Sequence, residues 1–254
     1  MENIDQHLRN FITVNLLDLE KAALLDRIDT KYVFNHTQLP SFLEQLKDHY
    51  FVLEIDDKRM FHYESLYFDT DDLALYNLHY CGRLNRYKIR FRRYVESNLS
   101  FFEIKFKNNK GRTIKSRISQ SPDDIIKGDA LSLLSEKTPF TQKHLKATIW
   151  VNYIRITLVS KDFSERLTLD LDLTFKNSSK EKQIENLVIA ELKQGKLGYS
   201  FFGNLMKVNR IKQGSLSKYC YGITNLYKEV RSNNFKEQIA LLNKILHAPT
   251  PESK

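Results

Sequence analysis

Arg86-Tyr-Lys-Ile-Arg-Phe-Arg92 alternates cationic with apolar side chains, and two later stretches, residues 102–107 and 113–118, repeat this alternation with charged or polar side chains. A period of two is typical of a β-strand with one buried face, so three successive strands are predicted with their cations on a shared face. For any one strand, the simplest interpretation is an amphipathic sheet whose charges lie in solvent. Like charges opposed across neighbouring strands destabilise a sheet, so the whole set indicates that an anion lies among them.

The same alternation returns in residues 153–158, 166–173 and 188–193, where Arg, Lys and a few carboxylates alternate with aliphatic side chains. Further strands are predicted over residues 27–34, 51–55 and 63–68. A sheet that is charged on one face and aliphatic on the other is best closed into a barrel with its polar face inside. We therefore expect an α+β fold, an antiparallel barrel of about eight strands with a polar, cationic lumen and helices packed outside.

Apolar residues at helical spacing predict the segments that cover this barrel. The segment 38–49 is predicted to cover the outer face, and a helical connection over 121–147 is expected to lie outside as well. One or two helices are predicted over residues 4–26, and further helices over 199–208 and 235–247. No repeat or linker interrupts the chain, so residues 1–254 are expected to form a single domain. Its core is predicted over about 27–221, followed by a C-terminal helix over 235–247.

The charge balance and the cysteines narrow the class of protein. Forty Lys and Arg against 31 Asp and Glu give a formal net charge of +9, which indicates an anionic partner. Cys81 and Cys220 are too few for a disulfide framework, so a cytoplasmic location is expected. The first residues lack the basic and apolar regions of a signal peptide, and no uncharged apolar stretch approaches the length of a membrane span.

Nine short motifs follow one another in the order seen in a known family. They are Arg27-x-Asp29-x-Lys31-Tyr32, Tyr67-Phe68-Asp69-Thr70, Lys88-x-Arg90-x-Arg92, Glu103-x-Lys105, Lys115-x-Arg117, Tyr153-x-Arg155, Arg166-x-Thr168-x-Asp170, Glu191-x-Lys193 and Ser217-Lys218-Tyr219. From about Arg27 to Tyr221 the chain thus resembles the VTC-domain polyphosphate polymerases of the triphosphate tunnel metalloenzyme superfamily. It departs from their pattern twice: Asp29 replaces a more common Glu, and Ser215 stands where a basic residue precedes Lys218.

The cations on the predicted inner face outnumber what one phosphate needs, which favours a triphosphate or polyphosphate ligand. With the resemblance, catalytic roles are expected for Lys31, Arg90, Arg92, Lys105 and Lys115. Phosphate-binding roles are expected for Arg83, Lys88, Arg117, Tyr153, Arg155, Arg166, Lys193, Ser217 and Lys218.

Two carboxylates, Glu103 and Glu191, each precede a lysine of this set by two residues. Such a carboxylate either pairs with the neighbouring cations or binds a hard divalent ion that bridges phosphate oxygens. The resemblance implies the second role, with Mn²⁺ or Mg²⁺ as the cofactor.

The resemblance implies a polyphosphate polymerase that transfers the γ-phosphate of ATP to a growing inorganic polyphosphate chain. No Walker motif, glycine-rich kinase loop or Ser/His/Asp arrangement is evident, so catalysis is expected to depend on charge and positioning. Two alternatives stay open: a triphosphatase or polyphosphatase with the same fold, and a non-catalytic polyphosphate-binding module. Nucleic acid is not expected, because the charged residues alternate with buried aliphatic side chains and not with exposed aromatics that stack on bases. A membrane-associated partner is left open.

Overall fold

The alternating stretches form one mainly antiparallel sheet in a computed structural model that describes residues 2–21, 28–196 and 198–247. Its longer strands are β2 (Ile28–Asn35), β4 (Phe61–Asp69), β5 (Arg86–Tyr94), β6 (Leu99–Lys107), β7 (Thr113–Ser119), β8 (Lys146–Ser160), β9 (Glu165–Lys176) and β11 (Leu187–Gln194). The shorter ones are β1 (Thr13–Val14), β3 (Tyr50–Leu53), β10 (Glu181–Ile184) and β12 (Gln213–Gly214). The strands pair in the order β12-β2-β11-β9-β8-β4-β5-β6-β7, while β3 also joins β8, β1 joins β3 and β10 joins β9.

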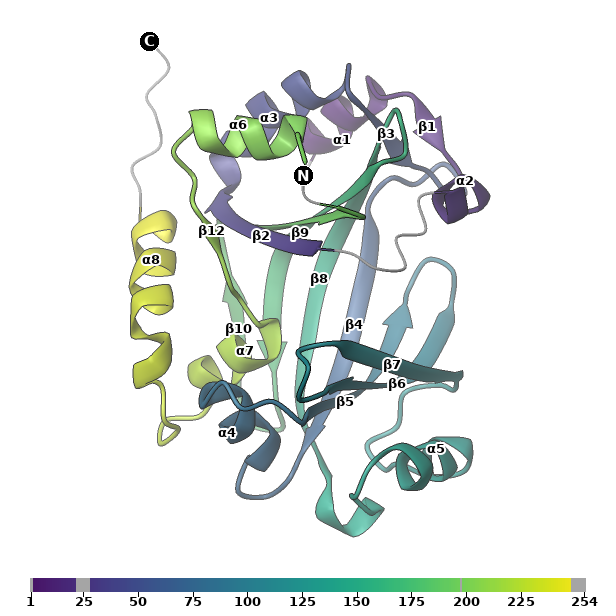
Figure 1. Cartoon of the computed structure of the whole chain (residues 1–254), viewed down its shortest axis with the longest axis vertical. Helices are drawn as coiled ribbons and strands as arrows, with labels where there is room; N and C mark the ends of the chain where they lie inside the picture. The colour runs from purple at the N-terminus through teal and green to yellow at the C-terminus, as the bar shows by residue number, and fades with distance from the viewer. Residues whose placement is uncertain (1, 22–27, 197, 248–254) are drawn as a thin grey trace.

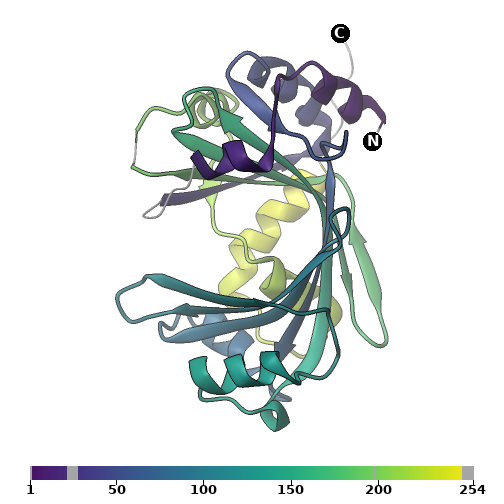
Figure 2. The ribbon, with the colours of Figure 1, turned by 90° about the vertical axis from the view of Figure 1, so that its right-hand side faces the viewer.

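The sheet is strongly curved, and its two ends face each other across an open side (Figure 2). Within the described residues no ladder joins β7 to β12 or β2, so closure of the predicted barrel is not seen. The eight longer strands match the expected number of about eight, and four short strands extend the sheet to twelve. In the described part of the chain, neither edge strand of the sheet is covered by a further strand. The strand β12 pairs with β2 over two residues only, and β7 is mostly exposed, including Ile114. Alternation in a sequence indicates which side chains share a face, but it carries no information about whether the first and last strands pair.

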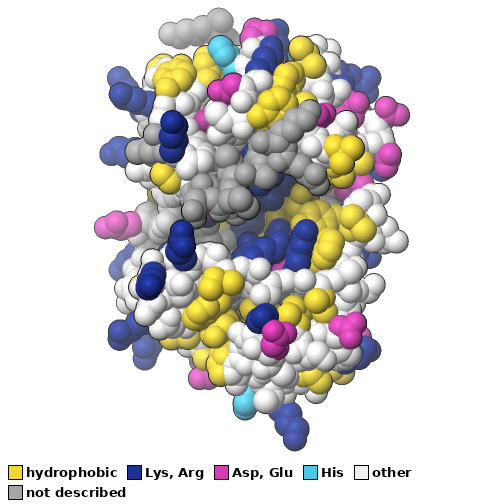
Figure 3. Space-filling view, turned by 45° about the vertical axis from the view of Figure 1, so that its right-hand side comes forward, with side chains coloured by type: hydrophobic (Ala, Val, Ile, Leu, Met, Phe, Trp, Pro, Cys, Tyr) yellow, Lys and Arg dark blue, Asp and Glu magenta, His cyan; other side chains and the backbone are white. Residues whose placement is uncertain are grey.

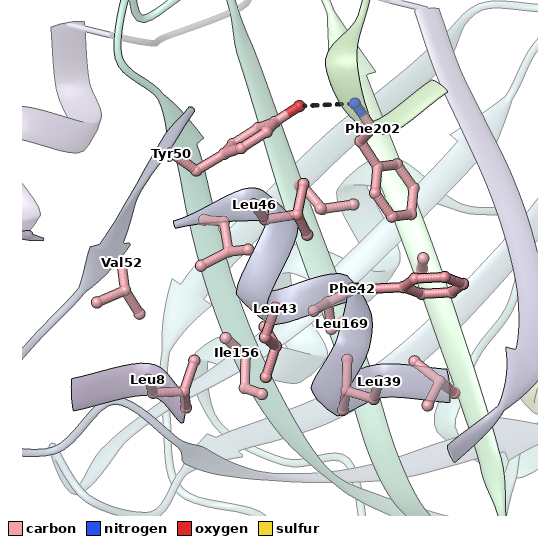
Figure 4. Packing of buried hydrophobic residues seen from close by; sticks show 14 of the residues in the cluster. Leu8, Leu39, Phe42, Leu43, Leu46, Tyr50, Val52, Ile156, Leu169 and Phe202 are labelled. Atoms are coloured by element: carbon pink, nitrogen blue, oxygen red, sulfur yellow. Dashed lines mark hydrogen bonds between the residues drawn. The ribbon is translucent and has the colours of Figure 1, made fainter. Parts of the chain in front are cut away.

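Helices cover the outer face of the sheet, as predicted, but three others, described below, lie on its concave side (Figure 1). The helices α1 (Glu2–Arg9), α3 (Leu39–Leu46) and α6 (Phe201–Val208) pack over β8, β9 and β11. Four residues of α3, Leu39, Phe42, Leu43 and Leu46, are buried at the spacing i, i+3, i+4 and i+7 (Figure 4). Each such side chain contributes about 1.5–3 kcal/mol by leaving water. A separate helix, α5 (Asp129–Lys137), covers the outer side chains of β5 and β6.

Two helical predictions change in detail. Over residues 4–26, where one or two helices were expected, the structure has α1 and α2 (Leu16–Lys21) with the short strand β1 between them. Residues 22–27, with Arg27 of the first motif, lie outside the described residues. The expected connection over 121–147 contains α5 and a short 3₁₀ turn (Gln142–His144) before β8 begins. In the part of the chain that the structure describes, no helix is long and apolar enough to cross a membrane.

The inner face of the sheet is polar in the middle and apolar at one end. Asp172 has a positive φ of 50°, and a bulge here brings Leu173 and Phe175 into the same cluster as Ile149 and Val151 of β8. The helix α7 (Lys218–Leu226) packs on this apolar end, and an added Cβ at Gly222 would lie 2.6 Å from Ile149 Cδ1. The close approach requires glycine, and the packing fills this end of the concave face.

Two more helices border the concave side: α4 (Ala74–Tyr80) and α8 (Lys236–Leu246). The Asn35 side chain at the end of β2 donates a hydrogen bond to the carbonyl of Ile245 at 2.8 Å, and this contact ties α8 to the sheet. Phe235 packs edge-on against Tyr76 and Tyr80 of α4, so the two helices support each other.

Candidate phosphate-binding groove

The inner face of the sheet gathers most of the predicted site residues. Strand pairing places Lys88 of β5, Lys105 of β6 and Lys115 of β7 directly opposite one another. On the other half of the sheet, Lys31 lies opposite Glu191, and Lys193 lies opposite Arg166. Figure 3 shows a hollow near the middle of the molecule with Lys and Arg side chains inside it. We call this hollow, bounded by β2, β11 and β5 to β7, the groove.

A cavity of about 450 Å³ occupies the side of the groove next to α7 and α8. Six cationic side chains line it: Lys31, Arg86, Lys88, Lys105, Lys107 and Lys115. The nearby charge of Arg90, together with burial and Arg92, holds the pKa of Lys105 well below its usual range. Burial likewise lowers the pKa of Lys88, with Lys31 and Arg90 adding to the effect. A bound polyanion would relieve this repulsion, so the charges of the groove favour an anionic ligand.

Glu103 lies at the centre of the β5–β7 wall and is fully buried. Its Oε2 accepts hydrogen bonds from Arg90 Nε at 2.9 Å and Nη2 at 2.6 Å, and Lys115 Nζ lies 2.5 Å from its Oε1. Arg90 Nη1 also donates to the Tyr67 hydroxyl at 2.7 Å. Burial alone would raise the pKa of Glu103, but Arg90, Arg92 and Lys115 hold it far below the usual carboxyl range. Glu103 is therefore ionised and orients two of the predicted catalytic cations.

Asp170 does the same for the opposite wall. Arg155 donates two hydrogen bonds to this carboxylate, from Nε to Oδ1 at 2.6 Å and from Nη2 to Oδ2 at 2.8 Å. Lys218 of α7 pairs with the same carboxylate. Burial would raise the pKa of Asp170, yet Arg155 and Lys218 lower it to about 2. The guanidinium of Arg155 also lies over the rings of Tyr63 and Tyr153, at 4.8 and 5.2 Å from their centroids.

The far side of the groove from the cavity carries arginines on an aromatic surface. Arg92 donates to Ser65 at 3.1 Å and lies 5.5 Å from the ring centroid of Tyr63, while Arg117 lies 4.5 Å from that of Phe101. Tyr63 stacks on Tyr153. These contacts leave the guanidinium forks fixed in direction, as bidentate binding of phosphate oxygens requires.

Glu191, unlike Glu103, borders the cavity, and its side chain is 18% exposed. It lies between Lys31 Nζ at 3.1 Å and Lys193 Nζ at 3.0 Å. Burial would raise the pKa of Glu191, but Lys193 and Lys31 hold it well below the usual range. Among the described residues no group of three His, Cys, Asp or Glu could hold a metal ion. A single carboxylate such as Glu191 still fits Mg²⁺ or Mn²⁺, since Mg²⁺ commonly binds one or two carboxylates together with substrate phosphates and water.

The start of α7 brings the last predicted residues to the groove. The Ser217 hydroxyl caps the helix by accepting from the amide of Cys220, and it also accepts a hydrogen bond from Lys88 Nζ at 3.1 Å. Of the predicted set, Arg83 lies apart: it is exposed in the turn before β5 and does not border the cavity.

Asp69 is a positioning residue that the sequence motif contains but whose role the sequence does not reveal. It lies at the end of β4 and accepts hydrogen bonds from the amides of Leu75 and Tyr76 at 2.8 and 2.9 Å, which satisfies the first turn of α4. The same carboxylate accepts the hydroxyl hydrogen bond of Tyr219. Asp69 therefore fixes α7, and with it Lys218, relative to the sheet.

We expect Tyr219→Phe to lower the free energy of unfolding by about 1–2 kcal/mol, because Asp69 loses one buried donor. Binding of inorganic tripolyphosphate should weaken as well, because Lys218 is held less firmly. Denaturant unfolding and calorimetric titration measure the two effects. Tyr199→Phe removes a hydroxyl from a residue that is 81% exposed and serves as the control; equal behaviour of the two variants would contradict the positioning role.

Several groove residues were given no role in the site predicted from the sequence. The alternation of β5 and β6 places Arg86 and Lys107 on the predicted cationic face, and the structure adds that both line the cavity. His79 comes from α4, and burial together with Lys88 and Arg86 lowers its pKa to about 3. Nothing in the local sequence signals the cavity contacts of His79 or of α8, because they arise only when α4 and α8 pack beside the sheet.

The fold and the groove together define an α+β protein whose curved sheet presents a cationic concave face. The VTC domain family model matches residues 26–227, and the chain belongs to this family. A comparison of the chain with curated proteins found no match.

Among solved structures, a putative adenylate cyclase from Vibrio parahaemolyticus is 11% identical, with a TM-score of 0.46 over 78% of this chain and 99% of that one. A putative adenylyl cyclase from Hippeastrum, described as having a dominant triphosphatase activity, is 10% identical, with a TM-score of 0.48 over 80% of this chain and 100% of that one. A conserved hypothetical protein from Pyrococcus furiosus is 12% identical, with a TM-score of 0.42 over 77% and 99%.

Proposed function

We propose that the chain is a polyphosphate polymerase that uses ATP and a divalent metal. The observation that carries this proposal is the meeting of six cations from four strands around one cavity, beside the partly exposed carboxylate of Glu191. So many cations exceed the need of a single phosphate and match a chain of phosphates. Membership of the VTC domain family supports the same substrate class.

In the proposed reaction a terminal oxygen of the polyphosphate chain attacks the γ-phosphorus of ATP. The new P–O–P bond forms as the bond from the γ-phosphorus to the bridging β,γ-oxygen breaks, and ADP leaves with that oxygen and its electron pair. Phosphoryl transfer of this kind depends on alignment and charge neutralisation more than on covalent chemistry by the protein. In this proposal Lys105, Lys115 and Arg90 bind the transferred group; its support is that all three lie on the β5–β7 wall around Glu103.

The other wall would bind the incoming chain. Lys31, Lys193 and Arg155 lie on β2, β11 and β8, and each is oriented by a carboxylate of the groove. A divalent ion held by Glu191 would neutralise phosphate charge as a Lewis acid. The groove is open along one side of the curved sheet, so a long chain can lie along the cations without passing through the end that α7 fills.

Incubation of the purified protein with ATP and Mn²⁺ tests the proposal. We expect long phosphate chains on a gel, ADP in equal amount to the phosphate incorporated, and loss of both products when EDTA is added. Orthophosphate without chains would show a triphosphatase or polyphosphatase. Tight polyphosphate binding without turnover under any divalent ion would leave only the binding module.

A further inference from the structure

The cavity has two chemically different walls. One wall consists of the six cations from β2 and β5 to β7. The other wall comes from α7, α8 and the residues directly before each of these helices. It is largely apolar and consists of Leu216, Tyr221, Phe235, Ile239 and Leu242. A bare phosphate chain would contact the first wall and leave the second in water, so the cations alone do not account for the shape of this cavity.

The apolar wall is built into the fold and does not depend on a ligand to form. Leu242 is buried, Phe235 packs on Tyr76 and Tyr80, and Gln238 Nε2 donates to the Ser215 hydroxyl at 2.9 Å. Ile239 is half-buried and borders the cavity from the middle of α8. Preformed, mainly apolar walls with a few polar groups are typical of sites for small organic molecules, and about 450 Å³ lies in their size range.

Polar side chains that border the cavity could recognise a heterocycle. His79 borders the cavity with its imidazole ring. Gln238 also lines the cavity with a side-chain amide that can donate and accept. A nucleobase carries donors and acceptors around an apolar ring, and so matches this mixture of contacts.

The other aromatic surface of the groove offers less room for a base. The ring centroid of Tyr63 lies 5.3 Å from that of Tyr153 and 4.8 Å from that of Tyr94. The guanidinium of Arg155 also lies over the Tyr63 ring. The faces of these rings are therefore used within the protein. The cavity beside α8 combines an apolar surface, polar side chains and adjacent cations in one place.

We infer that the α7–α8 wall, centred on Ile239, is the binding site for the nucleoside of a nucleoside triphosphate whose phosphates lie on Lys88, Lys105 and Lys115. The inference rests on the proposed function and adds to it the part of the protein that distinguishes ATP from an inorganic triphosphate. The triphosphate then extends from the helices toward Arg90 and Glu103, with the γ-phosphate farthest from α8.

The test compares ATP with methyl triphosphate, which has the same phosphate ester and charge but no nucleoside, in binding titrations with EDTA present. We expect the wild-type protein to bind ATP about tenfold more tightly, the effect of covering roughly one apolar side chain with the base. Ile239→Ser should reduce this preference to about twofold or less. Leu241→Ser on the same helix, at a residue that is 44% exposed and does not line the cavity, should keep it.

Photolabelling of the wild-type protein with 8-azido-ATP gives a second measurement that needs no variant. We expect the label on the residues of this wall, 216–221 or 235–242. Label on β4 or β8 instead, or an ATP preference that survives Ile239→Ser, would overturn the inference. Chain synthesis from ATP and binding of methyl triphosphate report separately on the proposed function: if both persist while the ATP preference is absent, the nucleoside site alone is wrong.

Discussion

Glu191→Gln is expected to reduce metal-dependent phosphoryl transfer at least about 100-fold while leaving polyphosphate binding intact. Glu191 is the carboxylate that borders the cavity, and its pKa, held low by Lys193 and Lys31 against the effect of burial, keeps it ionised. Removing its charge removes a ligand that a divalent ion would need. The cations stay in place, so polyphosphate binding measured with EDTA should be unchanged or tighter.

Initial rates of ADP formation over a range of Mn²⁺ concentrations measure the effect. Glu181→Gln makes the same charge change on β10, in an exposed pair with Lys176, and should keep the wild-type rate. A Glu191→Gln variant with wild-type metal dependence would remove Glu191 from the metal site. Weaker polyphosphate binding by the Glu191→Gln protein would show instead that Glu191 orients Lys31 and Lys193 for the phosphates.

The inner face of the sheet could be predicted from the sequence because the direction of a strand side chain is a local property. Lys88, Lys105 and Lys115 meet across β5, β6 and β7 since short turns join these strands and fix their register. The carboxylates on this face were expected as well. Which cation pairs with which carboxylate was not, because Lys115 reaches Glu103 from a neighbouring strand.

Features that depend on distant contacts could not be predicted in the same way. The bulge at Asp172 breaks an alternation that reads as regular from residues 166 to 173, and only the pairing with β8 reveals it. The cavity wall on α8 belongs to a helix that the sequence identifies correctly, yet its neighbours, Ser215 and Phe235, follow from how α8 packs. The fold class was thus accessible, whereas closure of the sheet and the apolar side of the site were not.

Glu103→Gln is expected to lower the free energy of unfolding by about 3 kcal/mol or more, the cost of breaking a buried ion pair. Glu103 is fully buried between Arg90 and Lys115, and glutamine cannot neutralise these two cations. Denaturant unfolding at pH 7 measures the loss. Glu64→Gln breaks the more exposed pair with Arg93 and should cost under about 1 kcal/mol.

The difference in stability between wild type and Glu103→Gln should also depend on pH in one direction. The folded-state pKa of Glu103 lies far below the unfolded value of about 4.3, so its charge stabilises the folded state fully above that value. As the pH falls below about 4.3, Glu103 of the unfolded chain becomes protonated while Glu103 of the folded chain stays ionised. The stabilisation by this carboxylate is therefore lost progressively as the pH approaches the folded-state pKa. The two proteins should therefore converge in acid, whereas a metal-binding role without ion pairing predicts equal stability at every pH in the absence of metal. Equal stability, combined with lost metal-dependent activity, would assign Glu103 to the metal and remove it from the ion-pair network.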